Sequence, residues 1–328
     1  MTPRMKAVQH GIVSALACLA MTVAGTASAQ WTPAKPIRVI VPSSAGGSAD
    51  ATTRVLADGV NRTISQRVIV ENRAGASGNI GSEAAARAAP DGYTWLMINN
   101  AQAANVSLYK NLTYDLLRDF APVTQVDSSP HVIVVHPTLP VKNVKELVAL
   151  AGQKPGQLDY ASAGLGTVTH LAAEIFKAQA GVDMRHVPYK GGGESLTSIV
   201  SGETIVYFSP LPVALSHMRN GRIRGLGLTS KKRMPQVPDI PTVAEQGYPQ
   251  YEFNLWNGLL VPAKTPREIV VSIRNAAIAA MKAPDVSKRM FEMTSQPVGS
   301  TPEEFGAFLK SEVDSIAELV KRLKLSAE

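Results

Sequence analysis

Short β-branched runs and longer segments with apolar residues at helical spacing alternate along the chain. The apolar run at 37–41 predicts a buried strand, and residues 48–60 repeat apolar positions every three to four residues, which predicts a helix. Ser48 is predicted to cap that helix, and Asp50 lies in its first turn, where a negative charge suits the helix dipole. Further predicted elements are strands at 68–70 and 93–98 and a helix at 82–89. This order predicts a parallel sheet with right-handed crossovers.

The same alternation returns in the second half of the chain. The predicted strands are 132–135, 158–161, 205–208 and 223–229, and the predicted helices are 144–150, 167–181, 194–200, 266–281 and 302–323. The strand at 223–229 is expected to return to the first unit. Two α/β units of similar size follow from this pattern.

The first thirty residues carry the pattern of a secretory signal peptide. Two basic residues precede an apolar core at 12–23, and Ala-Ser-Ala at 27–29 predicts cleavage before Gln30. The core is about a dozen residues long, whereas a membrane span needs roughly 20. We therefore expect a periplasmic protein with a cleaved leader. An uncleaved anchor and a lipoprotein modified at Cys18 are the alternatives.

Composition then narrows the possible chemistry. The chain has 33 basic and 26 acidic residues, a net charge of +7, which falls to +5 once the leader and its two basic residues are removed. Cys18 is the only cysteine, so a disulfide framework and a cysteine-based zinc site are excluded. Export argues against a nucleic-acid partner, and the basic run at 231–233 is interpreted as a solvated turn.

Two loops combine small residues with a predicted helix start. Residues 42–50 and 162–170 are rich in glycine and serine, and each follows a predicted strand. The first amides of a helix lack internal partners and carry part of the dipole's positive charge, so such loops favour a carboxylate, phosphate or sulfate. Ordinary helix capping is the alternative for each loop taken alone.

Catalytic motifs are missing from the sequence. It contains no H-E-x-x-H, no G-x-S-x-G and no P-loop, and no two histidines have the spacing of zinc ligands on one helix. His170 and Asp50 are interpreted as structural residues of their helices. We therefore predict no catalytic residue, no metal and no cofactor.

Several stretches match a known family in order and spacing. They are residues 42–50, 70–81, 90–94, 114–115, 119–123, 189–191, 238–242, 256–259 and 301–305. Together they resemble the extracytoplasmic solute-binding proteins of tripartite tricarboxylate transporters, the Bug family. The resemblance implies a type II periplasmic-binding-protein fold, in which two α/β domains are joined by two crossover strands. The implied boundaries are a signal peptide at 1–29, domain I at 30–127 plus 228–328, and domain II at 128–227.

The resemblance also implies which residues hold the ligand. In this family the two loops act as jaws on a carboxylate, and the end of the third strand and the stretch at 189–191 complete the pocket. The implied ligand-binding residues are Ser43, Ser44, Ala45, Gly46, Gly47, Ser48, Asp50, Asn99, Asn100, Gln102, Ser162, Gly164, Gly166, Thr167, Thr169, Tyr189, Lys190 and Ser209.

Two departures from the family pattern bear on the ligand. Ser43 stands where the family usually has a bulky residue, which could open the pocket to a larger ligand. Ser209 stands where the family often has Asp, and the loss of that carboxylate argues against aspartate or glutamate as the ligand.

The function expected from these observations is capture of a small di-, tri- or aromatic carboxylate and its delivery to the subunits of a membrane transporter. The protein is expected to act as a monomer and to close around its ligand by a hinge motion. A secreted α/β hydrolase or transferase that uses the same anion site is one alternative. A ligand sensor for a membrane kinase is another.

Overall fold

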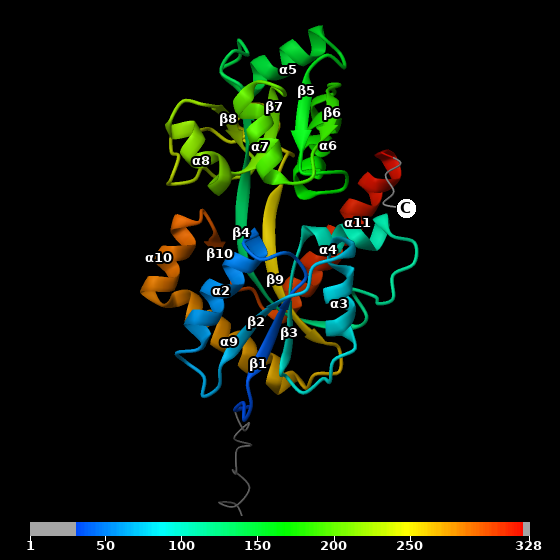
Figure 1. The fold of residues 1–328 in the computed structure, drawn as a ribbon, viewed down its shortest axis with the longest axis vertical. Coiled ribbons are helices and arrows are strands. Elements are labelled where there is room, and N and C mark those ends of the chain that lie inside the picture. Colours follow the sequence, from blue (N-terminus) through cyan, green and yellow to red (C-terminus); the bar gives the residue numbers. More distant parts are fainter. Residues whose placement is uncertain (1–30, 324–328) are drawn as a thin grey trace, which may run out of the picture. The chain divides into compact units, whose positions relative to one another are not determined.

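Strands and helices alternate through residues 31–323, the part of this computed structural model that is described (Figure 1). The strands are β1 (Ile37–Val41), β2 (Val68–Asn72), β3 (Thr94–Asn99), β4 (Phe120–Val135), β5 (Asp159–Ser162), β6 (Arg185–Pro188), β7 (Val206–Pro210), β8 (Arg224–Leu228), β9 (Asn254–Pro262) and β10 (Gln296–Pro297). The helices are α2 (Ser48–Val60), α3 (Asn79–Ala86), α4 (Asn100–Leu108), α5 (Val144–Gln153), α6 (Val168–Ala180), α7 (Gly192–Ser201), α8 (Leu211–Arg219), α9 (Arg267–Lys282), α10 (Pro284–Glu292) and α11 (Pro302–Leu323), with short 3₁₀ turns η1 (Ala76–Gly78) and η2 (Ala244–Gln246).

One sheet runs through all the strands, in the order β2-β1-β3-β9-β4-β7-β5-β6, with β8 and β10 each pairing with β4. β1 is parallel to β2 and β3, and β5 is parallel to β6 and β7, as the strand–helix order predicted. β4 connects the two groups, because its residues 120–130 pair with β9 and its residues 131–135 pair with β7. We call the strands on the β9 side the first section and those on the β7 side the second section.

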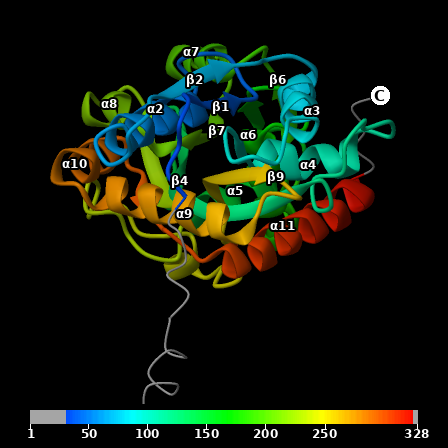
Figure 2. The ribbon, with the colours of Figure 1, turned by 90° about the horizontal axis from the view of Figure 1, so that it is seen from below.

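Helices cover both faces of the first section. α2, α9 and α10 pack together on one side, and α4 packs against α11 on the other, as the view from below shows (Figure 2). The approach of α2 to α9 is close at Gly59, where a Cβ atom would lie 2.7 Å from the Cβ of Ala280. The helices thereby fix where each strand end, and the loop that follows it, emerges from the sheet.

A buried carboxylate ties the long strand β4 to its neighbours. Asp127 is 1% exposed and accepts hydrogen bonds from Thr52 Oγ1 at 3.0 Å, from Asn257 Nδ2 at 2.8 Å and from the Ser295 hydroxyl. Burial raises the pKa of Asp127 above its ordinary value, while these donors act in the opposite direction. Residues of α2, of β9 and of the segment that precedes β10 therefore meet at one side chain of β4, near the point where β4 leaves the first section.

The route of the chain back to the first section differs from the prediction. The segment predicted as a returning strand forms β8, which pairs antiparallel with β4 in the second section. β9, for which the sequence pattern gave no prediction, makes the return and pairs with both β3 and β4. Ser48 is also not the cap of α2: Gly47 occupies the N-cap position, and Ser48 is the first helical residue.

Two predictions on chain organisation remain open. The signal peptide lies outside the described residues, and the boundaries of domains I and II stay a prediction, since one sheet is continuous across both sections. Within residues 31–323, no helix has both the length and the apolar character needed to cross a bilayer.

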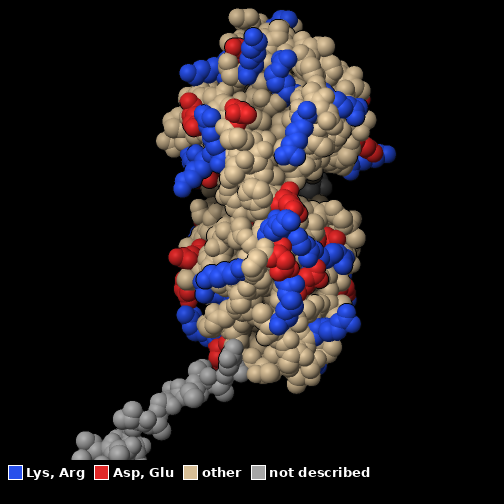
Figure 3. Space-filling view, turned by 90° about the vertical axis from the view of Figure 1, so that its left-hand side faces the viewer, with Lys and Arg blue, Asp and Glu red and all other residues tan. Residues whose placement is uncertain are grey.

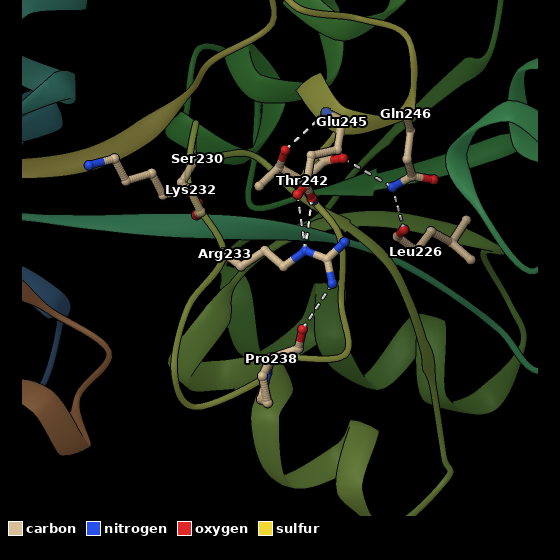
Figure 4. Close-up of polar contacts among 8 residues, drawn as sticks. All are labelled: Leu226, Ser230, Lys232, Arg233, Pro238, Thr242, Glu245 and Gln246. Atoms are coloured by element: carbon tan, nitrogen blue, oxygen red, sulfur yellow. Dashed lines mark hydrogen bonds and ion pairs between the residues drawn. The ribbon is translucent and has the colours of Figure 1, made fainter.

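The basic run at 231–233 is an exposed turn, as its composition predicted. Arg233 Nε lies 2.9 Å from Glu245 Oε2, and Arg233 Nη1 donates to the Pro238 carbonyl at 3.2 Å (Figure 4). The face that carries α2 and α10 mixes both signs of charge in the same way (Figure 3), with Arg62 2.9 Å from Asp285. Such exposed ion pairs contribute little to the free energy of unfolding, so the fold does not depend on them.

Buried His131 on β4 makes the fold acid-sensitive. Its ring is fully buried against Phe253, its nitrogens have no hydrogen-bond partner among the described residues, and burial lowers its pKa to about 3. Between the unfolded value of 6.5 and about 3, the unfolded state binds more protons, so the free energy of unfolding falls as the pH falls.

Replacing this histidine should flatten that dependence. We expect His131→Leu to lower the slope of the free energy of unfolding against pH by up to ~1.4 kcal/mol per pH unit below pH 6.5. Urea unfolding over a pH series measures both slopes, and the comparison is unaffected by any constant loss of stability in the variant. Equal slopes would contradict a neutral buried His131.

Candidate functional site

Four helix N-termini line one cavity of about 360 Å³. Its walls include Ala49 in the first turn of α2 and the N-cap residues of α3, α4 and α6, which are Gly78, Asn99 and Thr167. The first three come from the first section and Thr167 comes from the second. Because each N-terminus carries about half a positive charge, the four helix ends direct positive potential at the cavity without any basic side chain in its lining.

Side chains cap only one of these four helix ends. The N-cap residues of α2, α3 and α6 make no side-chain capping bond, and only Asn99 caps its helix, accepting from the Ala101 amide at 2.9 Å. None of the residues that line the cavity in the described part of the chain has a charged side chain. Uncapped N-termini around an uncharged cavity favour anion binding over the alternative of ordinary capping.

The carboxylate of Asp50 fixes the conformation of the first loop from outside the cavity lining. The carboxylate accepts from the Gly46 amide at 2.8 Å, from Arg54 Nε at 3.0 Å and from Asn72 Nδ2 at 3.0 Å. Burial opposes ionisation, but these three donors outweigh it and hold the pKa of Asp50 below its ordinary value. Asn72 also donates to the Ser43 carbonyl at 3.2 Å, so one cluster fixes both ends of the loop.

Glycine forms the floor of the cavity where three segments meet. A Cβ on Gly78 would lie 2.4 Å from Gln102 Nε2 and 2.6 Å from the Pro42 carbonyl oxygen, so only glycine fits. Its neighbours Ala76 and Ser77 have φ values of +46° and +54°, a left-handed conformation that costs free energy in residues other than glycine. Tertiary contacts hold this strained turn, for example the 2.9 Å bond from Asn105 Nδ2 to the Ser77 carbonyl.

The second loop is held by its own internal hydrogen bonds. Thr167 Oγ1 donates to the Gly164 carbonyl at 2.7 Å, the Ala163 amide donates to Thr169 Oγ1 at 2.9 Å, and the Gly164 amide donates to Ser162 Oγ at 3.1 Å. Several amides that the sequence assigned to a ligand are therefore already engaged inside the loop. The loop is a preformed wall whose hydroxyls are also engaged within the protein, so the N-terminus of α6 is the group left to face a ligand.

The structure brings only part of the expected set of ligand-binding residues to this cavity. Ser43, Ser44, Asn99, Gln102, Gly166 and Thr167 line it. Outside its lining are Ala45, Gly46, Gly47, Ser48, Asp50, Asn100, Ser162, Gly164, Thr169, Tyr189, Lys190 and Ser209. Ligand contact by any of these residues stays a prediction.

Five of the residues outside the lining are buried in the protein, namely Asp50, Asn100, Ser162, Thr169 and Ser209. Asn100 is 1% exposed and links α4 to β9, accepting from the Trp256 amide at 3.1 Å and donating to the Asn254 carbonyl at 3.1 Å. Ser209 is fully buried and donates to the carbonyl of Pro210. Position 209 therefore gives no evidence against an amino-acid ligand. That evidence comes instead from the lining, which has no charged side chain to pair with an ammonium group.

Sequence reasoning missed one whole side of the cavity. The lining residues that it did not name individually are Pro42, Ala49, Ala74, Gly75, Ser77, Gly78, Met97, Ala101, Asn105, Leu108, Tyr109 and Leu165, of which Pro42, Ala49 and Leu165 lie within the two predicted loops. The signal for residues 74–78 was present, because this glycine-containing stretch belongs to the motif at 70–81. The side chains at 105–109 gave no signal, because a helix sequence does not show what its far end faces.

A second cavity, of about 620 Å³, lies between α6, α11 and the start of β9. Its walls carry Glu252, Glu312 and Glu318, with Arg322 as the basic residue. Burial raises the pKa of Glu312, which accepts from Trp256 Nε1 at 2.7 Å. This larger cavity is acidic, so the smaller one is the better candidate for an anion.

Glycine at position 78 offers a direct test of the cavity floor. We expect Gly78→Ala to weaken ligand binding by at least about tenfold, because the added Cβ displaces Gln102 and cannot adopt φ +92° without strain. Gly152→Ala in α5 is the matched control, since its Cβ meets nothing within 4 Å. Calorimetric titration of both variants, with thermal unfolding as a check on folding, measures the effect. Equal affinities would place the ligand elsewhere.

Residues 52–325 match the model of the tripartite tricarboxylate transporter family receptor. Protein BugT of Bordetella pertussis is 34% identical over 301 residues, which cover 91% of this chain and 92% of BugT. These matches span both sections of the sheet.

Solved structures agree with the fold. The periplasmic binding protein BugD superposes with a TM-score of 0.76 at 30% identity, covering 90% of this chain and 99% of BugD. A structure of an R. palustris protein with adipate gives a TM-score of 0.79 at 31% identity, with the same 90% and 99% coverage. The fold is therefore that of the periplasmic binding proteins, as the resemblance in the sequence implied.

Proposed function

Because this chain belongs to the tripartite tricarboxylate transporter receptor family, we propose that it binds a small carboxylate in the cavity lined by helix N-termini. In this proposal it acts in the periplasm and delivers the ligand to a membrane transporter. The family is one of receptors, so the chain is a binding protein rather than an enzyme.

The observation that carries the proposal is the convergence of α2, α3, α4 and α6 on an uncharged cavity. A carboxylate there receives amide and hydroxyl hydrogen bonds and the field of four dipoles, and it needs no buried cation. Ser43 supplies a further donor, because its hydroxyl is buried, has no partner among the described residues and belongs to the lining.

The apolar part of the lining indicates what lies between the charges of the ligand. Met97, Leu108, Tyr109 and Leu165 contribute to the walls, and Leu165 is 55% exposed at its position in the second loop. A dicarboxylate with an aliphatic or aromatic spacer matches such walls. The similar R. palustris protein was solved with adipate, a ligand of this kind. An ammonium group finds no acidic partner among the lining residues, so amino acids are excluded by this proposal.

Direct binding measurements test the ligand class. Mass spectrometry of natively purified protein identifies a bound ligand, and calorimetry then compares dicarboxylates of increasing length, an aromatic dicarboxylate, a tricarboxylate, aspartate and inorganic phosphate. We expect binding of one or more carboxylates without chemical change, and weak or absent binding of aspartate. Tight binding of aspartate but not of its deaminated analogue would overturn the proposed ligand class.

Position 43 distinguishes the cavity from other surfaces. We expect Ser43→Ala to weaken binding by about tenfold through loss of one hydrogen bond. Ser43→Trp should abolish binding, because the indole fills much of the 360 Å³ cavity. Ser216→Trp, at an exposed position on α8 outside the lining, is the size-matched control. Retained affinity in Ser43→Trp would contradict this site.

Ligand binding should also bring the walls together. Thr167 and its neighbours belong to the second section, whereas most of the lining belongs to the first, so a shared ligand favours the conformation in which both sections contact it. Small-angle X-ray scattering should therefore show a smaller radius of gyration at saturating ligand. An unchanged scattering curve with proven binding would exclude closure.

A further inference from the structure

Three aromatic rings stack beneath the second loop. The rings of His170 on α6 and His186 on β6 have centroids 4.2 Å apart, and the ring of Tyr160 on β5 lies 4.9 Å from that of His186. Neither histidine belongs to the cavity lining. The stack therefore supports the loop from behind, and the function proposed above leaves it without a role.

The polar atoms of both histidines reach the loop itself. The Gly166 amide donates to His170 Nδ1 at 3.1 Å, and His186 Nε2 lies 2.6 Å from Ser162 Oγ, where either atom can be the donor. Ser162 Oγ in turn accepts from the Gly164 amide. Both loop glycines are thus fixed through the histidine pair, and Gly166 lines the cavity.

The hydrogen bond from Gly166 defines the protonation state of His170. Nδ1 must be an unprotonated acceptor, because a second proton there would point one N–H at another. Burial and then the neighbouring His186 lower the pKa of His170 to about 4, so the ring is neutral near pH 7. The atom that accepts from the Gly166 amide is therefore one that loses its ability to accept when it binds a proton.

The other titratable groups around the ring do not remove this sensitivity. Glu174 opposes the lowered pKa of His170, and Lys177 adds to it. Glu174 is also engaged elsewhere: it accepts from Tyr160 Oη at 2.5 Å and from Lys177 Nζ at 2.7 Å. The carboxylate nearest the pair is thus occupied by two donors of its own.

We propose that His170, supported by the stacked His186, is a positioning residue that holds the second loop in its binding shape, and that ligand affinity falls when His170 is protonated. The inference rests on the proposed function, since the loop is taken as one wall of the ligand site. Ligand and proton then act in opposition: the ligand stabilises the loop shape that requires a neutral ring, and a proton on Nδ1 removes that shape.

Two substitutions of His170 distinguish the effect of losing the hydrogen-bond acceptor from the effect of gaining a positive charge. His170→Leu removes the acceptor and should weaken ligand binding by about tenfold at neutral pH. His170→Asn retains an oxygen near the place of Nδ1 and cannot gain a charge, so its affinity should stay close to that of the unmodified protein at neutral pH. His136→Asn is the matched control, because His136 Nδ1 likewise accepts a nearby amide, that of Thr138 at 3.3 Å, outside the cavity.

Affinity measured by calorimetry between about pH 7 and about pH 3.5 supplies the decisive comparison, because this range passes through the pKa of His170, which is about 4. The ligand's own carboxyls titrate identically with every protein, so the ratio of affinities between a variant and the unmodified protein cancels that effect. The ratio for His170→Asn should rise as the pH falls, whereas the ratio for His136→Asn should stay constant. Parallel pH profiles for His170→Asn and the unmodified protein would overturn the proposal.

A measurement without ligand keeps the inference separate from the proposed function. Hydrogen exchange followed by NMR should show a protected Gly166 amide in the unmodified protein and in His170→Asn, and an unprotected one in His170→Leu, with thermal unfolding confirming that each variant is folded. Equal protection in all three would refute the positioning role. If protection of the Gly166 amide is lost only in His170→Leu, as expected, but none of the three proteins binds a carboxylate, the ligand site is refuted and the positioning role stands.

Discussion

The convergence of four helix N-termini on one uncharged cavity is the constraint around which the structure is arranged. Like ends of helix dipoles repel one another, and amides without acceptors are costly to bury. The sheet and its helices supply the stability that keeps these ends together. An anion offsets the repulsion between these ends and accepts hydrogen bonds from their amides, which is why the arrangement favours binding of a negatively charged ligand.

The loops that precede α2, α6 and α7 are held by the same kind of hydrogen bond. In each, a side chain in the first helical turn accepts the amide of the residue four positions earlier. Asp50 accepts from Gly46, His170 accepts from Gly166, and Glu194 accepts from the Lys190 amide at 3.1 Å. The acceptor in the first and last pairs is a carboxylate, but in the second pair it is a neutral imidazole, whose accepting atom can bind a proton.

The support for the cavity extends to the strand that joins the two sections. Asp127 on β4 collects donors from Thr52, Asn257 and Ser295, and Thr52 lies on α2, one turn beyond the first loop. The first loop is therefore connected to β4 through buried hydrogen bonds. Changes in how β4 bends can reach the cavity by this route, which is a physical basis for coupling closure to binding.

The sequence by itself determined the local elements and the chemistry of the two loops. Helical spacing located α2, α6 and α11, and the glycine- and serine-rich stretches marked two of the four N-termini around the cavity. The motifs in their order also indicated the family. These features depend on neighbouring residues alone, so they can be read without knowledge of the fold.

Only the tertiary structure decided which elements meet. Periodicity reports which face of an element is buried but not against what, so β8 was assigned to the wrong section, and the pairing of β9 with both β3 and β4 was missed. The strained turn at Ala76 and Ser77 and the histidine stack under Gly166 arise for the same reason. Their partners are distant in the sequence, and only the order of strands in the sheet brings them within reach.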